Sequence, residues 1–158
     1  MPSIAALVRL HEGLRLTVYD DATGEPIGPG ATLIGHPTIG VGRALDVRGI
    51  SAAEADALLV RDLDEAAREL TEALPWVARL DPVRRAVLID MRHNLGQRGL
   101  LRFRRTLAAV EAGDWAAAAR GMGRSKWARQ VKTRAVRLQA MMRSGTWPPD
   151  VTHAAPLP

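Results

Sequence analysis

Cysteine is absent from the 158 residues, so neither disulfide bonds nor thiolate metal sites can form. The four histidines, at positions 11, 36, 93 and 153, have none of the spacings of metal-binding helices, so we expect no metal and no cofactor. Aromatic residues make up only 4% of the chain and offer little for stacking on nucleic-acid bases. No apolar run approaches the ~18 residues of a membrane span, and the N-terminal stretch is too short and too charged for a signal peptide.

Positive charge is plentiful: the net charge is +5, and arginine clusters in the second half of the chain, as in "RFRR" and "RSKWARQVKTRAVR". A basic surface favours polyanions such as nucleic acid, lipopolysaccharide, anionic lipid, and the acidic sugars and peptides of a bacterial wall. An ordinary solvated surface from an arginine-rich genome explains the same composition, so charge alone does not choose a partner.

Hydrophobic periodicity divides the chain into a helix, a β region and a series of further helices. Ser3 caps a predicted helix that Gly13 ends. Residues 14–45 are rich in glycine and proline, and their runs "TLI" and "TIGV" predict short strands. Ser51 and Glu54 form a capping box that opens a long helix. Further helices are predicted from "DP" at 81–82, over 100–112, over 114–121 and from about 131 to 144, before a loose tail at 148–158.

Glu12 lies four residues after Val8 and therefore near the apolar side of the first helix, at its C-terminal end. Partial burial and the negative end of the helix dipole would both disfavour its ionised form. These conditions suit a carboxyl group that donates a proton, although an ordinary surface glutamate at a frayed helix end fits the local sequence as well.

Asp20 and Asp21 follow in a region where carboxylates stay ionised, and in a strand only one of the two can face a cleft. Thr38 stands between Pro37, which favours extended backbone before it, and glycines at 40 and 42 that permit close approach of backbone or ligand. An ordinary turn and a twisted hairpin explain these two stretches equally well.

Arg134 points toward the apolar side of the last long helix, where a guanidinium needs an anionic partner. Glu12 is the candidate partner. The alternative is an arginine whose stem packs while its head reaches water.

The order of a helix-borne glutamate, eight residues, an aspartate, a loop and "TIGVG" is far more specific than any one part. With "HEGLRLTVYDD", "GISAAEADALLVRDLDEA", "DPVRRAVLIDMRHNLG" and "SKWARQVKTRAVRLQAMMRSGTW", the chain resembles the phage-type lysozymes, glycoside hydrolase family 24, over about residues 4–147. The resemblance implies an α+β, lysozyme-like fold in one catalytic domain, residues 1–158. Its parts would be a β lobe at 14–50, a connecting helix at 51–74, and a helical lobe made of 1–13 and 75–147.

The resemblance also implies roles for single residues. Glu12 matches the catalytic acid, Asp21 the second carboxylate, and Thr38 the third active-site position. Arg134 matches the arginine that pairs with the catalytic glutamate. Weaker local matches place three residues near the cleft and the helical-lobe entrance: Asn94, Phe103 and Thr106.

The implied activity is hydrolysis of the β-1,4 bond between N-acetylmuramic acid and N-acetylglucosamine in peptidoglycan, with inversion and lysis of the bacterial cell. An inverting course places the two carboxyl groups roughly 6.5–9.5 Å apart, against about 5–5.5 Å for a retaining one. We expect a monomer that accumulates in the host cytoplasm, reaches the wall after a separate protein permeabilises the membrane, and contacts the anionic envelope electrostatically.

Two features depart from the family pattern. The loop between Asp21 and Thr38 is longer than in the T-even phage member, and Gly121 replaces an asparagine near bound sugar. Three alternatives remain: a lytic transglycosylase acting on the same bond with one glutamate, a basic helical nucleic-acid-binding protein, and a catalytically silent wall-binding relative. The position of Asp21 and Thr38 argues against the first, and the lack of a recognition motif against the second.

Overall fold

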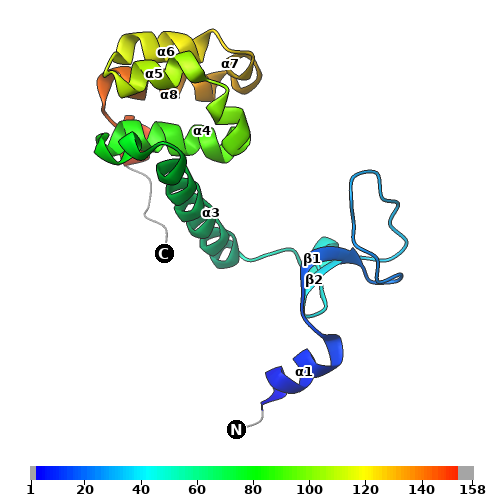
Figure 1. Ribbon diagram of the computed structural model, residues 1–158. Coiled ribbons are helices and arrows are strands. Elements are labelled where there is room, and N and C mark those ends of the chain that lie inside the picture. Colours follow the sequence, from blue (N-terminus) through cyan, green and yellow to red (C-terminus); the bar gives the residue numbers. More distant parts are fainter. Residues whose placement is uncertain (1–2, 153–158) are drawn as a thin grey trace. The chain divides into compact units, whose positions relative to one another are not determined.

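The computed structural model describes residues 3–152, and the chain divides into two compact units, Met1–Ala55 and Asp56–Pro158. Among the described residues, the first unit contains two short helices and a small antiparallel sheet, and the second is built from helices (Figure 1). The predicted α+β fold class is therefore confirmed. Within residues 3–152, no helix has the length and apolar character that crossing a membrane requires.

Helix α1 (Ile4–Glu12) begins and ends at the predicted residues. The Ser3 side chain accepts a hydrogen bond from the Ala6 N–H at 3.2 Å. Gly13 follows the helix with a φ of 72°, which favours glycine, and its N–H donates to the carbonyl of Arg9. No residue of α1 is buried, so its apolar stripe finds no packing partner within its own unit.

Three short strands form the sheet in the order β1 (Arg15–Asp20), β2 (Pro37–Gly40) and β3 (Arg43–Ala44). Thr38 on the central strand lies opposite Tyr19 on one side and Ala44 on the other. Gly40 ends β2 and Gly42 lies in the β2–β3 turn, and their φ angles of 71° and 67° lie in the left-handed region. Both predicted glycine positions are therefore required by the backbone.

The long loop between β1 and β2 corrects one prediction (Figure 1). The run "TLI" at 32–34 forms no strand. The Asp20 carboxylate accepts hydrogen bonds from the Ile34 N–H at 2.7 Å and from the Gly35 N–H at 3.0 Å. The Asp20 carboxylate therefore accepts the hydrogen bonds that the carbonyls of a neighbouring strand would accept if these residues formed a strand.

The chain continues through α2 (Leu45–Arg48) into α3 (Ala52–Ala73). The predicted capping box is confirmed: the Glu54 N–H donates to Ser51 Oγ at 3.2 Å, and the Ser51 N–H donates to Glu54 Oε2 at 2.7 Å. The buried residues of α3 lie in its second half.

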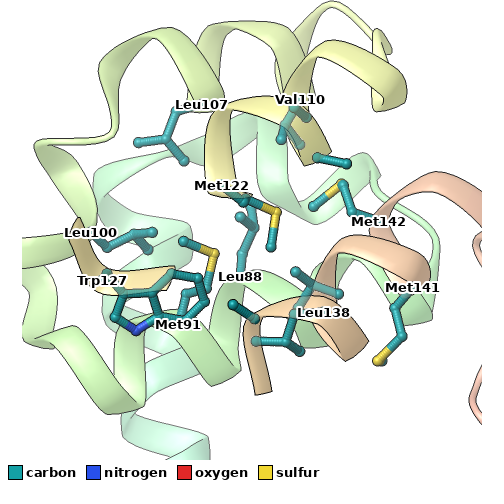
Figure 2. Packing of buried hydrophobic residues seen from close by; sticks show 14 of the residues in the cluster. Leu88, Met91, Leu100, Leu107, Val110, Met122, Trp127, Leu138, Met141 and Met142 are labelled. Atoms are coloured by element: carbon teal, nitrogen blue, oxygen red, sulfur yellow. The ribbon is translucent and has the colours of Figure 1, made fainter. Parts of the chain in front are cut away.

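The remaining elements are the 3₁₀ helix η1 (Pro75–Arg79), then α4 (Pro82–Leu101), α5 (Arg104–Glu111), α6 (Trp115–Gly123), α7 (Lys126–Val131), α8 (Thr133–Ser144) and α9 (Pro149–Thr152). Figure 2 shows the hydrophobic core that these helices enclose. Leu88, Met91, Leu100, Met122 and Met142 are all completely buried there. Their burial accounts for much of the stability of the helical unit, at about 1.5–3 kcal/mol for each large side chain.

Helix α4 starts as predicted, because the Asp81 side chain accepts a hydrogen bond from the Arg84 N–H at 3.0 Å. It is kinked at Gly96, whose φ of 69° and ψ of 164° are not helical. The Arg84 guanidinium donates to the carbonyls of Met142 and Arg143, and thereby ties the start of α4 to the end of α8.

Helix α7 is absent from the sequence prediction, although Ser125 provides its signal by accepting a hydrogen bond from the Ala128 N–H at 3.0 Å. Lys132, with a φ of 46°, separates α7 from α8. Within the tail expected to be loose, α9 forms and Asp150 pairs with Arg137, whereas residues 153–158 lie outside the described residues. The prediction that residues 1–13 join the helical lobe concerns the arrangement of the two units and stays a prediction.

Candidate active site

Glu12 is the last residue of α1, and its carboxylate lies against the β2–β3 loop. A Cβ atom added to Gly42 would stand 3.0 Å from Glu12 Oε2, so glycine leaves the room that this contact needs. Gly40 has open space at the same position. The Glu12 side chain is otherwise exposed, so its own unit does not provide the partial burial expected from the helix face.

Asp21 lies in the turn that follows β1, and both its side chain and its backbone N–H are hydrogen-bonded to the backbone of His36. Its Oδ1 accepts a hydrogen bond from the His36 N–H at 2.7 Å, and its own N–H donates to the His36 carbonyl at 3.1 Å. Gly35 makes this geometry possible, because a Cβ there would stand 2.2 Å from Asp21 Oδ1. No bond within residues 3–152 reaches Oδ2, which is therefore free to act on another group.

Asp20 has a different environment from its neighbour. Its side chain is only 4% exposed and accepts hydrogen bonds from the N–H groups of Ala22, Ile34 and Gly35. These donors, the Ile34 N–H foremost, lower the pKa of the Asp20 carboxyl below its ordinary value. A carboxylate with both oxygens occupied by backbone is suited to holding the loop, whereas Asp21 keeps a free oxygen.

Thr38 is buried on the central strand, only 2% exposed. Its Oγ1 donates to the His36 carbonyl at 3.2 Å. Because the hydroxyl proton is committed to that carbonyl, the oxygen lone pairs remain to accept a hydrogen bond. Asp21 and Thr38 therefore meet on the backbone of His36, and Glu12 contacts the loop that follows β2, all within the first unit.

The three weaker candidates lie together in the helical unit. Trp127 joins two of them, because its Nε1–H donates to Asn94 Oδ1 at 2.7 Å and its ring meets Phe103 edge-on with centroids 6.1 Å apart. Phe103 and Thr106 line a pocket of about 670 Å³ together with Trp127 and Gly121. Thr106 fills the space where Gly121 lacks a side chain, since a Cβ there would stand 2.4 Å from Thr106 Oγ1.

Arg134 on α8 finds its anionic partner inside the helical unit. Its Nε donates to Asp90 Oδ1 at 2.9 Å, and the pair is partly exposed. This contact satisfies the requirement for an anion that the sequence indicated, with an aspartate from α4. The proposed pairing with Glu12 would join the two units and stays a prediction.

Sequence reasoning missed His36, which lies beside Asp21 and Thr38, and Asp46, which bonds the His36 imidazole. His36 contacts both through its backbone, and its Nδ1 lies 2.8 Å from Asp46 Oδ2 on α2. The register across the long loop hides this position, because nothing in the sequence places residue 36 beside residue 21. Among the described residues, no group of three histidine, aspartate or glutamate side chains is placed to hold a metal ion.

A glutamate at a helix end, an aspartate just after the first strand and a threonine on the central strand of a small sheet, and a unit built from helices define the class of lysozyme-like α+β proteins. Residues 9–143 match the family model described as phage lysozyme, and the chain belongs to that family. The resemblance in the sequence is thereby confirmed.

Two relatives extend the comparison. The chain is 31% identical over 160 residues to the pre-baseplate central spike protein Gp5 of Enterobacteria phage T4, which covers 90% of this chain and 28% of that protein. It is 29% identical over 163 residues to probable T4-type lysozyme 1 of Dictyostelium discoideum, which covers 91% of this chain and 95% of that protein. Family membership supports the prediction of a peptidoglycan hydrolase of the lysozyme type and favours neither a lytic transglycosylase nor a nucleic-acid-binding protein.

Proposed function

We propose that the protein is an endolysin that hydrolyses the β-1,4 bond between N-acetylmuramic acid and N-acetylglucosamine in peptidoglycan, with inversion at the anomeric carbon. The observation that carries the proposal is that Asp21 and Thr38 are both hydrogen-bonded to the backbone of His36, Asp21 to its N–H and Thr38 to its carbonyl. A lytic transglycosylase needs one acid and no such pair, whereas an inverting hydrolase needs groups that hold and activate a water.

The chemistry assigns one task to each side chain. Glu12 donates a proton to the departing glycosidic oxygen. On the opposite face of the sugar, a water donates hydrogen bonds to the free Oδ2 of Asp21 and to the lone pairs of Thr38 Oγ1. As the water oxygen bonds to the anomeric carbon, Asp21 takes its proton, and the charge that develops on the sugar ring is stabilised by the same carboxylate.

The pocket in the helical unit supports recognition of an anionic polymer. Four cationic side chains line it: Arg102, Arg104, Arg105 and Lys126. None of the four forms an ion pair within the part of the chain that the structure describes, and no described carboxylate lines the pocket. Peptidoglycan carries lactyl and peptide carboxylates, so unpaired cations beside the apolar ring of Phe103 fit a glycan strand with its acidic peptide.

The same charge suits electrostatic contact with an anionic bacterial envelope. We propose that the protein acts as a monomer, is made in the host cytoplasm, and reaches the wall after a separate protein permeabilises the membrane.

The test is the loss of turbidity of permeabilised Gram-negative cells together with mass spectrometry and NMR of the released fragments. Wild type should release reducing muramyl fragments whose first-formed anomer is α, because inversion turns a β bond into an α product. Glu12→Gln and Asp21→Asn should each abolish lysis with the fold intact by circular dichroism. Glu25→Gln, an exposed glutamate of the same unit, is the matched control and should stay active.

Each alternative has its own signature in that experiment. A fully active Glu12→Gln enzyme would refute the assignment of the acid. Anhydro-muramyl products would identify a transglycosylase, and a β anomer would identify a retaining route. Binding to the wall without release of fragments would identify a silent relative.

A further inference from the structure

His36 stands immediately before β2, and its two backbone groups bond other parts of the candidate active site. Its N–H and its carbonyl bond Asp21, and the carbonyl also accepts the hydroxyl of Thr38. The orientation of this one residue therefore sets the positions of the two side chains that hold the water. Its imidazole takes no part in those contacts.

The imidazole is anchored from another element. Its Nδ1 lies 2.8 Å from Asp46 Oδ2, on the short helix α2 that packs against β2. The hydrogen bond to Asp46 and the charge of that carboxylate raise the pKa of His36, and the charges of Asp21 and Asp20 act in the same direction. In return, the hydrogen bond from His36 lowers the pKa of the Asp46 carboxyl.

The arginines on the elements around His36 either contact other groups or are exposed to solvent. Arg43 on β3 donates its Nε–H to the Gly49 carbonyl at 2.6 Å and pairs with Glu54. Arg15 on β1 lies over the ring of Tyr19. Arg48 is exposed on α2. The three carboxylates of Asp20, Asp21 and Asp46 thus form the charged surroundings of the imidazole.

We propose that His36 is a positioning residue whose ion pair with Asp46 fixes the backbone N–H and carbonyl of residue 36, which orient Asp21 and Thr38, so that catalysis weakens when the imidazole loses its proton. This inference rests on the proposed function and adds a pH-dependent control of the same site. A neutral imidazole can still share one hydrogen bond with Asp46, and deprotonation therefore loosens the contact without removing it.

The direction of the pH dependence follows from the pKa shifts. The pKa of His36 is raised above its ordinary value of 6.5, so the contribution of the pair is complete below pH 6.5 and is lost as the pH rises through the raised value. The pKa of Asp46 is lowered from 3.8, so on the acid side the pair persists until the pH falls below that value. The plot of activity against pH should therefore fall on its alkaline side, and this fall (the alkaline limb) should follow the loss of the His36 proton.

The experiment measures kcat and KM on soluble peptidoglycan fragments from pH 5 to 9, and follows the His36 imidazole by NMR titration. His36→Asn keeps the backbone groups and removes the charge, and kcat should fall about two- to fivefold below pH 6.5, as the loss of an exposed ion pair predicts, with KM unchanged and the alkaline limb gone. Asp46→Asn should move both the limb and the NMR titration of His36 toward pH 6.5. His93→Asn, a histidine of the helical unit, is the control and should keep the wild-type profile.

The outcomes separate the two proposals. Wild-type kcat and an unchanged alkaline limb in His36→Asn would overturn the inference, as would an NMR titration of His36 that Asp46→Asn does not move. Asp46→Asn carries the test alone if His36→Asn does not fold. A wild-type protein that releases no glycan fragments would instead refute the proposed function, and the inference with it.

Discussion

At the scale of single residues, the candidate active site depends on places where a side chain is missing. Gly42 admits the Glu12 carboxylate, and Gly35 admits Asp21. A Cβ atom would stand 2.2 Å from Asp21 Oδ1 at position 35, closer than packing allows, and 3.0 Å from Glu12 Oε2 at position 42, where the carboxylate would have to shift. Glycine is therefore needed here for space, and at Gly42 for its backbone conformation as well.

Gly42→Ala and Gly40→Ala separate these two requirements. Both positions have a φ near 70°, so both variants should lose about 1 kcal/mol of stability from backbone strain. Only Gly42→Ala also displaces Glu12, and its kcat should fall about tenfold or more relative to Gly40→Ala, because a misplaced acid loses its alignment. The measurements are thermal unfolding and fragment release. Equal activity of the two variants would show that the contact with Glu12 has no part in catalysis.

At the scale of elements, the loop between β1 and β2 is held by one carboxylate. Asp20 accepts hydrogen bonds from Ile34 and Gly35, which lie next to the segment that bonds Asp21. Asp20 thus fixes the end of this long loop without a strand, through hydrogen bonds from the backbone to a side chain.

Asp20→Asn should loosen this loop, because the amide brings its own N–H toward backbone donors that need an acceptor. In the wild type the pKa of Asp20 is lowered, so the carboxylate stabilises the loop above its ordinary pKa of 3.8 and ceases to do so as the pH falls through the lowered value. Hydrogen exchange at the Ile34 and Gly35 amides should therefore accelerate in Asp20→Asn at neutral pH, and in wild type only below about pH 3.8. The control Glu25→Gln should exchange like wild type, and protection that survives in Asp20→Asn would contradict the role of the carboxylate.

At the scale of the whole molecule, charge and core are concentrated in the helical unit. Its core is a single cluster of leucine, valine, alanine and methionine with the ring of Trp127 (Figure 2). The basic pocket lies between α5 and α7, beside that ring. In the proposed function, the first unit therefore provides the catalytic side chains, and the second provides the cationic side chains that bind the polymer.

Lysis should slow as salt rises above about 0.1 M, where the Debye length drops below ~10 Å. The double variant Arg104→Gln/Arg105→Gln should lyse more slowly at low salt and depend less on salt, because both side chains line the pocket. Arg61→Gln/Arg79→Gln removes the same charge from exposed positions outside the pocket and serves as the control. The rate of turbidity loss from 20 to 300 mM salt is the measurement. Salt-independent lysis by wild type would argue against electrostatic recruitment and leave the chemistry untouched.

The sequence by itself determined what depends on neighbours along the chain. Helix ends at Ser3, Gly13, Ser51 and Asp81 are set by caps within three or four residues, and the family is set by the order and spacing of its motifs. The resemblance alone assigns Asp21, and not Asp20, as the second carboxylate, and this assignment stays a prediction. The short helix α7 was missed because its apolar residues are too few to give a period.

Only the tertiary structure decided what depends on residues far apart in sequence. It placed His36 beside Asp21, gave Ile34 and Gly35 to Asp20 in place of a strand, and paired Arg134 with Asp90. The physical reason is that a long loop has no period, so its register is fixed by the few hydrogen bonds that close it. A charged side chain bonds whichever opposite charge the packing brings within reach, and that partner cannot be read from one sequence.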